Sequence, residues 1–288
     1  MKKINILIGI VVFSIIGFSF ISCDKIEEDN YLTKVESGTP DDPEPITSRV
    51  QKILIEDFTG HLCPNCPNAA VAAHSIMEKN KNVFLIGIHN SGNFSKPMGD
   101  YYTLNFETTE GEELRSTYKP QDYPSGMINR KESPSSQYGT WESSVNEIVN
   151  NTPLVYMTLA NSTYDTTTNK VSAKVTVNYH QGYIDGLNLV FAITEDGIVG
   201  YQTMPNNSHN PDYVHNHVLR QMPSGVWGTP FFAENINEGD SYAERKEFTL
   251  RDGLVWENCH LIAYFIKNDT EKREIVQVEQ IAIKDILK

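Results

Sequence analysis

The sequence is short of positive charge. Over its 288 residues, 24 Lys and Arg stand against 37 Asp and Glu, which gives a formal net charge of −13 at pH 7. A surface this acidic repels phosphate backbones, so we expect no nucleic-acid partner. The acidity by itself names no other partner.

The sequence also lacks the short motifs of several enzyme classes. It has no G-x-S-x-G, phosphate loop or paired-carboxylate motif, so hydrolase and nucleotide-dependent functions have no support. Glu195 and Asp196 are not followed by the ligand series of an EF-hand. No second C-x-x-C and no H-x₃-H is present to complete a zinc site. We therefore expect no metal and no cofactor.

The first residues carry an export signal. Lys2 and Lys3 precede an uncharged, mostly apolar run over residues 4–21, and Ser22 stands just before Cys23. A basic start, an apolar run and a small residue before the cut are typical of a secretory signal. The cysteine resembles that of the bacterial lipobox, although Phe20 replaces the usual Leu. The resemblance implies a lipoprotein signal peptide over 1–22 and a lipid on Cys23. The alternative is an uncleaved membrane anchor with an incidental cysteine.

Residues 23–50 are rich in acids and contain Pro40, Pro43 and Pro45, with few apolar residues. Such a segment cannot bury a core, and we interpret it as a lipidated acidic tether. The expected location is the cell outer membrane, on its periplasmic or its surface-exposed side. Once Cys23 carries lipid, three cysteines remain. In this oxidising compartment the close pair Cys63 and Cys66 can form a disulfide, which leaves Cys259 unpaired.

Two folded segments follow, with different patterns. Residues 51–151 alternate apolar strand-like runs, such as Lys52–Phe58 and Val83–His89, with amphipathic helical ones, such as Pro67–Asn80. This predicts a small α/β domain. Residues 152–288 hold several strand-like runs, among them Val171–Tyr179, and little helix, which predicts an antiparallel β-sandwich. Within it, Asn206–Gly239 is rich in Asn, Pro and Gly and is predicted to be a long loop.

The stretch EDFTGHLCPNCPNAA places Cys63 and Cys66 between a predicted strand and a predicted helix. Unpaired amides at a helix N-terminus stabilise a thiolate, so Cys63 is the candidate nucleophile and Cys66 the resolving cysteine. Zinc is an alternative, since C-x-x-C also occurs in zinc sites. It needs two further ligands, for which the donors are His61, His89 and the Cys259–His260 pair.

This arrangement resembles the thioredoxin superfamily. Asp57 lies six residues before Cys63 and is similar to the buried acid behind the thioredoxin disulfide, which implies that it accepts the proton of Cys66. Glu56 competes for this role, because neighbours on a strand face opposite ways. Pro124 precedes a predicted strand and resembles the cis-proline beside the cysteines. The thioredoxin Trp-Cys-Gly-Pro-Cys is replaced here by residues 62–66, LCPNC.

Four stretches, FTGHLCPNCPNA, YPSGMINRK, AITEDGIVGYQ and VHNHVLR, together resemble the twenty-eight-kilodalton outer membrane protein family. The resemblance covers nearly all of the chain after the signal peptide. It implies a lipoprotein with an α/β thioredoxin-like domain over 51–151 followed by an all-β Ig-like sandwich over 152–288. It implies no established reaction.

Two functions from different classes remain open. The first is thiol–disulfide exchange on envelope or surface proteins, in which Cys63 attacks, Cys66 resolves, Asp57 assists and Pro124 presents its backbone to the bound polypeptide. The second is a non-enzymatic surface-binding or adhesion lipoprotein in which the Cys63–Cys66 disulfide is structural. We further expect Cys259 to be a buried small hydrophobe. His215 and His217 alternate like the residues of one strand, and surface contact or hydrogen bonding is favoured for them over metal binding.

Overall fold

The computed structural model describes residues 33–34, 46, 48–180, 182, 186–231, 237–268 and 272–288. The predicted signal peptide over 1–22, the predicted lipidation site Cys23 and nearly all of the tether over 23–50 lie outside these residues. In the described part, every helix is too short or too polar to cross a bilayer.

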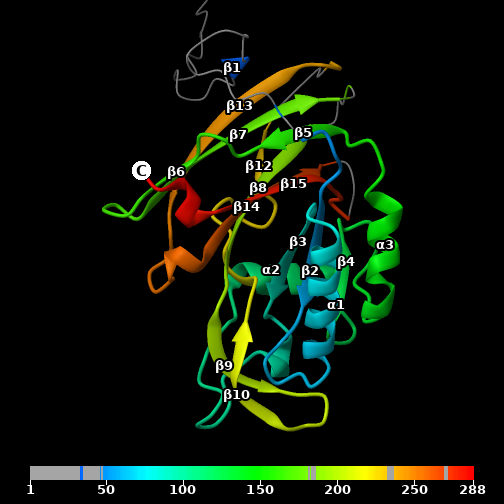
Figure 1. The fold of residues 1–288 in the computed structure, drawn as a ribbon, viewed down its shortest axis with the longest axis vertical. Coiled ribbons are helices and arrows are strands. Elements are labelled where there is room, and N and C mark those ends of the chain that lie inside the picture. Colours follow the sequence, from blue (N-terminus) through cyan, green and yellow to red (C-terminus); the bar gives the residue numbers. More distant parts are fainter. Residues whose placement is uncertain are drawn as a thin grey trace, which may run out of the picture. The chain divides into compact units, whose positions relative to one another are not determined.

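One large mixed sheet organises the chain (Figure 1). Its strand order is β15-β14-β8-β11-β3-β2-β4, and one further strand, β12, pairs with β8 outside this order. Strands β2 and β3 are parallel, and so are β3 and β11; the other pairs are antiparallel. The strands of this sheet are β2 (Ile53–Phe58), β3 (Val83–Ile88), β4 (Ser125–Ile128), β8 (Leu187–Glu195), β11 (Val218–Gln221), β12 (Thr229–Pro230), β14 (Cys259–Lys267) and β15 (Ile275–Ala282).

Helices cover both faces of the β2–β4 end of the sheet. Along β2, Ile53 and Ile55 pack with helices α1 and α3, while Leu54 and Phe58 pack on the opposite face, where α2 lies. This alternation follows from the two-residue repeat of a strand, and because both faces are covered the strand is apolar throughout its first half. The helices are α1 (Cys66–Lys79), α2 (Thr109–Tyr118) and α3 (Trp141–Ile148).

A smaller antiparallel sheet packs over the other end of the large one. Its inward residues, such as Val175 and Val177, form one core with Phe191, Leu261 and Phe265 of β8 and β14. The smaller sheet has the order β1-β13-β7-β5, with β6 paired to β7. Its strands are β1 (Thr33–Lys34), β5 (Val155–Thr158), β6 (Thr163–Asp165), β7 (Lys170–Tyr179) and β13 (Ser241–Thr249).

The predicted fold class, an α/β thioredoxin-like domain followed by an all-β Ig-like sandwich, is wrong. The described chain is predominantly β, and the strands from 51–151 do not form a sheet of their own. Strand β11 pairs with β3 on one side, Val218 lying opposite Gly87, and with β8 on the other. A single sheet therefore runs through both segments, although the residues between β2 and α1 and α3 form a core cluster of their own.

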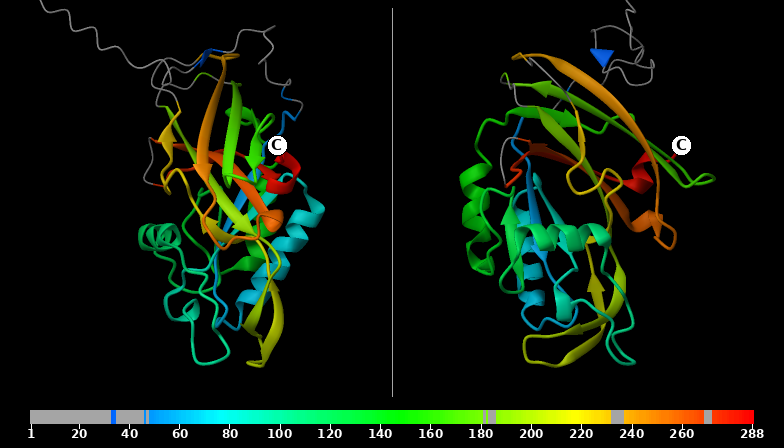
Figure 2. Two further views of the ribbon diagram at one scale, coloured as in Figure 1. Left: turned by 90° about the vertical axis from the view of Figure 1, so that its left-hand side faces the viewer. Right: turned by 180° about the vertical axis from the view of Figure 1, so that it is seen from behind.

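The prediction of a long loop over 206–239 is also wrong in part, because this segment contains strands β10, β11 and β12. Strand β10 (His209–His215) forms a two-stranded hairpin with β9 (Ile198–Thr203), which we call the cover hairpin. Pro211 gives β10 the appearance of a loop, and it is tolerated because the register shifts between Asn210 and Tyr213. In the turned views of Figure 2 the cover hairpin lies beside the segment that follows β3.

Candidate functional site

Cys63 and Cys66 form a disulfide at the start of α1. The helix begins at Cys66 with Pro67 in its first turn, where the absent proline N–H costs no hydrogen bond. The two Cα atoms are 5.5 Å apart. Both residues are buried, with exposed fractions of 1% for Cys63 and 3% for Cys66. The partly exposed Cys63 that an exchange function calls for is therefore absent from this closed arrangement.

The cover hairpin buries the pair. The amide nitrogen of Thr203 donates to the carbonyl oxygen of His61 over 2.8 Å, so β9 is attached to the loop that precedes the cysteines. The side chain of Gln202 lies deeper, and its Nε2 donates to the carbonyl oxygen of Cys63 over 3.0 Å. Access to the sulfur atoms therefore requires these contacts to break.

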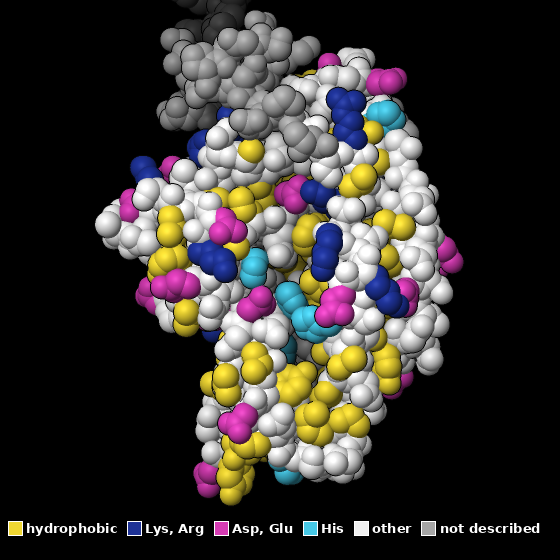
Figure 3. All heavy atoms as spheres, viewed as in Figure 1, with side chains coloured by type: hydrophobic (Ala, Val, Ile, Leu, Met, Phe, Trp, Pro, Cys, Tyr) yellow, Lys and Arg dark blue, Asp and Glu magenta, His cyan; other side chains and the backbone are white. Residues whose placement is uncertain are grey.

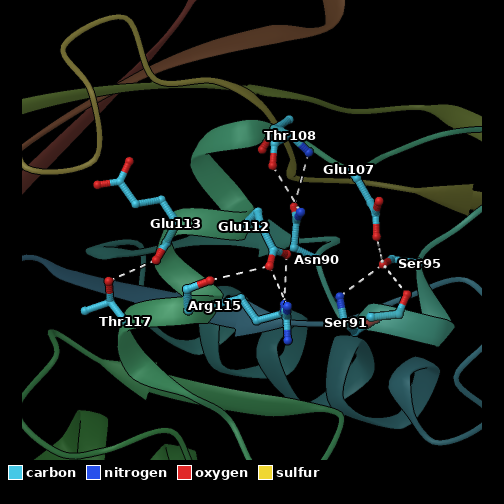
Figure 4. A network of polar contacts seen from close by, with 11 residues as sticks. Asn90, Ser91, Ser95, Glu107, Thr108, Glu112, Glu113, Arg115 and Thr117 are labelled. Atoms are coloured by element: carbon cyan, nitrogen blue, oxygen red, sulfur yellow. Dashed lines mark hydrogen bonds and ion pairs between the residues drawn. The ribbon is translucent and has the colours of Figure 1, made fainter.

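A second segment, which follows β3, holds the cysteine loop from another side. The amide of Leu62 donates to the carbonyl oxygen of Phe94 over 2.9 Å. A polar network fixes this segment (Figure 4): the hydroxyl of Ser95 donates to Glu107 over 2.7 Å, and Asn90 makes hydrogen bonds to both backbone groups of Thr108. The loop that carries Cys63 is thus held between two ordered segments.

Pro124 lies at the same end of the sheet. The Tyr123–Pro124 peptide bond is cis, as the sequence predicted. Strand β4 begins directly afterwards with Ser125, which pairs with Phe58 at the end of β2. The ring of Tyr123 packs edge-on against Phe94, with 6.1 Å between centroids. Pro124 therefore lies next to the segment that holds the cysteine loop; its role as a substrate contact stays a prediction.

Asp57 and Glu56 face opposite sides of the sheet, which separates the two candidates for the buried acid. Asp57 and Cys66 line the same small cavity on the α1 side. Glu56 points to the other face, where Arg130 donates two hydrogen bonds to it, of 2.7 and 2.6 Å. Only Asp57 of this pair is placed to act on the cysteines.

The carboxyl group of Asp57 is buried, at 4% exposure, and its Oδ1 has no hydrogen-bond partner among the described residues. Burial raises the pKa of Asp57 to about 8, because removal from water penalises the charged form. The group is therefore protonated at neutral pH. A buried carboxyl without a partner destabilises a fold, which makes Asp57, beside the cysteines, a candidate functional group.

Histidines surround the disulfide on the α1 side, and their number was not anticipated from the sequence. His74, His89 and His215 line the cavity that holds Asp57 and Cys66, which has a volume of about 50 Å³. Burial lowers the pKa of His215 to about 4, so its ring is neutral at pH 7. Figure 3 shows His side chains gathered in a hollow in the middle of the viewed face, beside acidic ones.

The strand-like alternation predicted for His215 and His217 is wrong. His215 ends β10, whereas His217 lies between strands with a left-handed backbone, at φ +57°. Both side chains are buried, and the rings of His217 and His74 are 5.2 Å apart. The Nδ1 atom of His217 lies 3.5 Å from Asp196. Because both are buried, the surface part of the favoured interpretation does not apply to either residue; an interface or hydrogen-bonding role stays a prediction.

The residues considered as zinc ligands make other contacts or lie in the core. The sulfur atoms of Cys63 and Cys66 are bonded to each other, and His61 makes a hydrogen bond to the carbonyl oxygen of Lys96 over 3.0 Å. Cys259 is free and fully buried in the core between the two sheets, as predicted. Throughout the described ranges no group of three or more His, Cys, Asp or Glu residues is arranged to hold a metal ion.

Gln202 and Thr203 are site residues that the sequence did not reveal. Their short stretch, IVGYQT, looks like any half-buried strand; the family stretch AITEDGIVGYQ ends at Gln202 but gives that residue no role. The available signal was the Asn206-Asn207 dipeptide, which is typical of a turn and in which Asn207 has φ +60°. It predicts that the strands on either side form a hairpin, but not what this hairpin covers.

The chain is similar to known proteins in sequence family and in fold. A family model described as Outer membrane protein Omp28 matches residues 112–286. The structure of HBP35 of Porphyromonas gingivalis superposes with a TM-score of 0.63 at 16% identity, over 83% of this chain and 77% of that one. A domain of the outer membrane lipoprotein Omp28 from the same organism has 19% identity and a TM-score of 0.28, over 46% of this chain and 90% of that one. No curated protein matches.

Proposed function

The chain belongs to the Omp28 outer membrane protein family, and from this premise we propose that it is a lipoprotein, anchored through a lipid on Cys23, that exchanges disulfides with envelope proteins. The outer membrane is the location that the family gives. The exchange is assigned to the Cys63–Cys66 pair, with Asp57 as the proton acceptor.

The observation that carries this proposal is the isolated carboxyl group of Asp57. A purely structural disulfide needs no acid beside it, and an uncompensated buried carboxyl lowers the stability of the fold. In exchange chemistry the same group has a use, because the resolving cysteine is buried and must lose a proton before it can attack. The shared cavity of Asp57 and Cys66 supports this assignment.

The steps follow from the positions of the two cysteines. In the reduced protein the Cys63 thiolate attacks the disulfide of a partner, forms a mixed disulfide and releases one partner thiolate. The Asp57 carboxyl group first releases its own proton to water, and the resulting carboxylate then takes the proton of the Cys66 thiol. The Cys66 thiolate attacks the sulfur of Cys63, the bond between Cys63 and the partner breaks, and the partner leaves as a thiolate that takes a proton from water.

A second function is favoured by one specific observation, the burial of both cysteines beneath the cover hairpin. A disulfide that solvent cannot reach serves as a structural bond, and the chain is then a non-enzymatic surface-binding lipoprotein. The reduction potential separates the two functions. Structural disulfides have potentials below about −300 mV, whereas exchange-active pairs range from about −270 to −120 mV.

The test of exchange is trapping by a Cys66→Ser variant of the full-length protein in cells. We expect it to accumulate mixed disulfides with envelope proteins, because Cys63 can still attack while the step that resolves the adduct is lost. Non-reducing gels measure the adducts, which should disappear with dithiothreitol. Cys63→Ser and Cys259→Ser are the controls and should form none. The proposal fails if Cys66→Ser forms no adducts, or forms them equally without Cys63.

The cover hairpin should limit access to the disulfide. Replacing Gln202 by Ala removes its hydrogen bond to the carbonyl oxygen of Cys63. Such a bond contributes about 1 kcal/mol, so we expect dithiothreitol to reduce the disulfide about fivefold faster. Gln221→Ala is the matched control, since Gln221 also donates to a backbone carbonyl, that of Thr249. Equal reduction rates in the wild type and both variants would show that the hairpin does not control access.

A further inference from the structure

Two residues that line the cavity beside Cys66 each have a buried polar atom without a partner. Oδ1 of Asp57 and Nε2 of His215 are both buried, both without a hydrogen-bond partner among the described residues, and both residues line this cavity. His215 is 3% exposed. One of these groups belongs to β2 and the other to the cover hairpin. Each buried polar group without a hydrogen bond lowers the stability of the fold, so we expect something to connect the two.

Nε2 is the ring nitrogen of His215 that is buried without a hydrogen-bond partner among the described residues. In the tautomer that carries its proton on Nδ1, Nε2 offers a lone pair to a donor. The protonated carboxyl group of Asp57 supplies the matching O–H donor. The cavity of about 50 Å³ has room for water between them, since one water needs only about 10–15 Å³.

We propose that His215 is a positioning and relay residue for the exchange: water in the cavity connects Asp57 to Nε2 of His215, and the proton of Asp57 leaves by this route. This inference rests on the proposed function. Asp57 must be ionised to accept the proton of Cys66, and at neutral pH it must first release its own. A neutral imidazole of low basicity takes that proton transiently and returns it to water at the half-exposed mouth of the cavity, near Ala70 and Asn216.

Other titratable groups face the same cavity and enter the pH dependence. They are His74 from α1, His89 just after β3 and Tyr213 on β10. His61, on the loop before the cysteines, acts on His215 through its charge, which lowers the pKa of His215. Burial lowers the pKa of His89 well below its usual value and raises the pKa of Tyr213, so both are neutral near pH 7. Neither has an unpartnered buried nitrogen or oxygen in the described structure, which singles out His215 as the acceptor.

The experiment follows the reaction of the reduced full-length protein, in detergent, with 5,5′-dithiobis(2-nitrobenzoate). Attack by Cys63 releases one thionitrobenzoate, and attack by Cys66 on the adduct releases a second, so the second phase reports resolution. In His215→Gln we expect that phase to slow at least about tenfold at pH 6.5 and to match the wild type above pH 9, where Asp57 is already ionised. His180→Gln is the control, since His180 packs against Tyr156 at a distance of 5.4 Å between ring centroids.

A second measurement needs no variant at the buried site. In the wild type, transfer through water predicts that the resolution phase is slower in heavy water at pH 6.5 and that this isotope effect is lost above pH 9. Slowing of His215→Gln by the same factor at every pH, or a resolution phase that it leaves unchanged, would overturn the relay. A wild-type protein without a second phase would overturn the exchange function itself, so the two failures are distinguishable.

Discussion

Replacing Asp57 by Asn is expected to stabilise the oxidised protein by about 4 kcal/mol at pH 7 and to leave its stability almost unchanged near pH 4. The carboxyl group has a folded-state pKa of about 8 and an ordinary value of 3.8 in the unfolded chain. Below pH 3.8 the carboxyl group is protonated in both states, so its ionisation does not lower the stability of the fold. Stability is lost as the pH rises from 3.8 to about 8, because over that window the unfolded chain ionises and the folded protein does not.

The measurement is the free energy of unfolding in urea at several pH values between 4 and 9. The wild type should lose stability across this range by up to about 1.4 kcal/mol for each pH unit, from Asp57 alone. The Asn variant should lack this component of the slope, since its amide does not titrate. Asp252→Asn, at an exposed loop position, is the matched control and should keep the wild-type slope. Parallel pH profiles for wild type and Asp57→Asn would show that the group is ionised in the folded state.

Local patterns predicted the elements that carry the cysteines. The strand over β2, the helix over α1 and the strand over β3 follow from apolar periodicity within short windows, and the cis bond before Pro124 followed from its motif. The same patterns could not show the sheet order. The pairing of Val218 with Gly87 joins positions 131 residues apart, and no local signal records which strand lies next to which.

Only the central residues of the candidate site were therefore predicted. Cys63, Cys66 and Asp57 were found from spacing, but the choice between Asp57 and Glu56 needed the face on which α1 lies. Gln202 and His215 come from the cover hairpin, whose β10 strand looks like a loop because of its polar residues and Pro211. Its effect on the cysteines depends on tertiary contacts, above all on the hydrogen bond from Gln202 to Cys63.

Glu56 and Arg130 illustrate a buried charge pair that sequence patterns do not reveal. Arg130 is fully buried and has a left-handed backbone, with φ +54°. Its guanidinium also donates to the hydroxyl of Tyr264 on β14 over 3.1 Å and lies over the ring of Tyr118, 5.3 Å from the centroid. The pair thus connects β2 and the end of β4 to a strand from the other segment of the chain, within the one large sheet.

Because removing one partner leaves the other charge buried and unpaired, Glu56→Leu or Arg130→Met is expected to lower the free energy of unfolding by about 3–5 kcal/mol. The double variant Glu56→Leu/Arg130→Met should lose much less than the sum of two such losses, since it leaves no unpaired charge. Urea unfolding measures all three. The control is Glu142→Gln, which breaks the exposed pair with Lys79 and should cost less than about 1 kcal/mol. Additive losses in the double variant would mean that each side chain acts through its own packing and that the charges are not coupled.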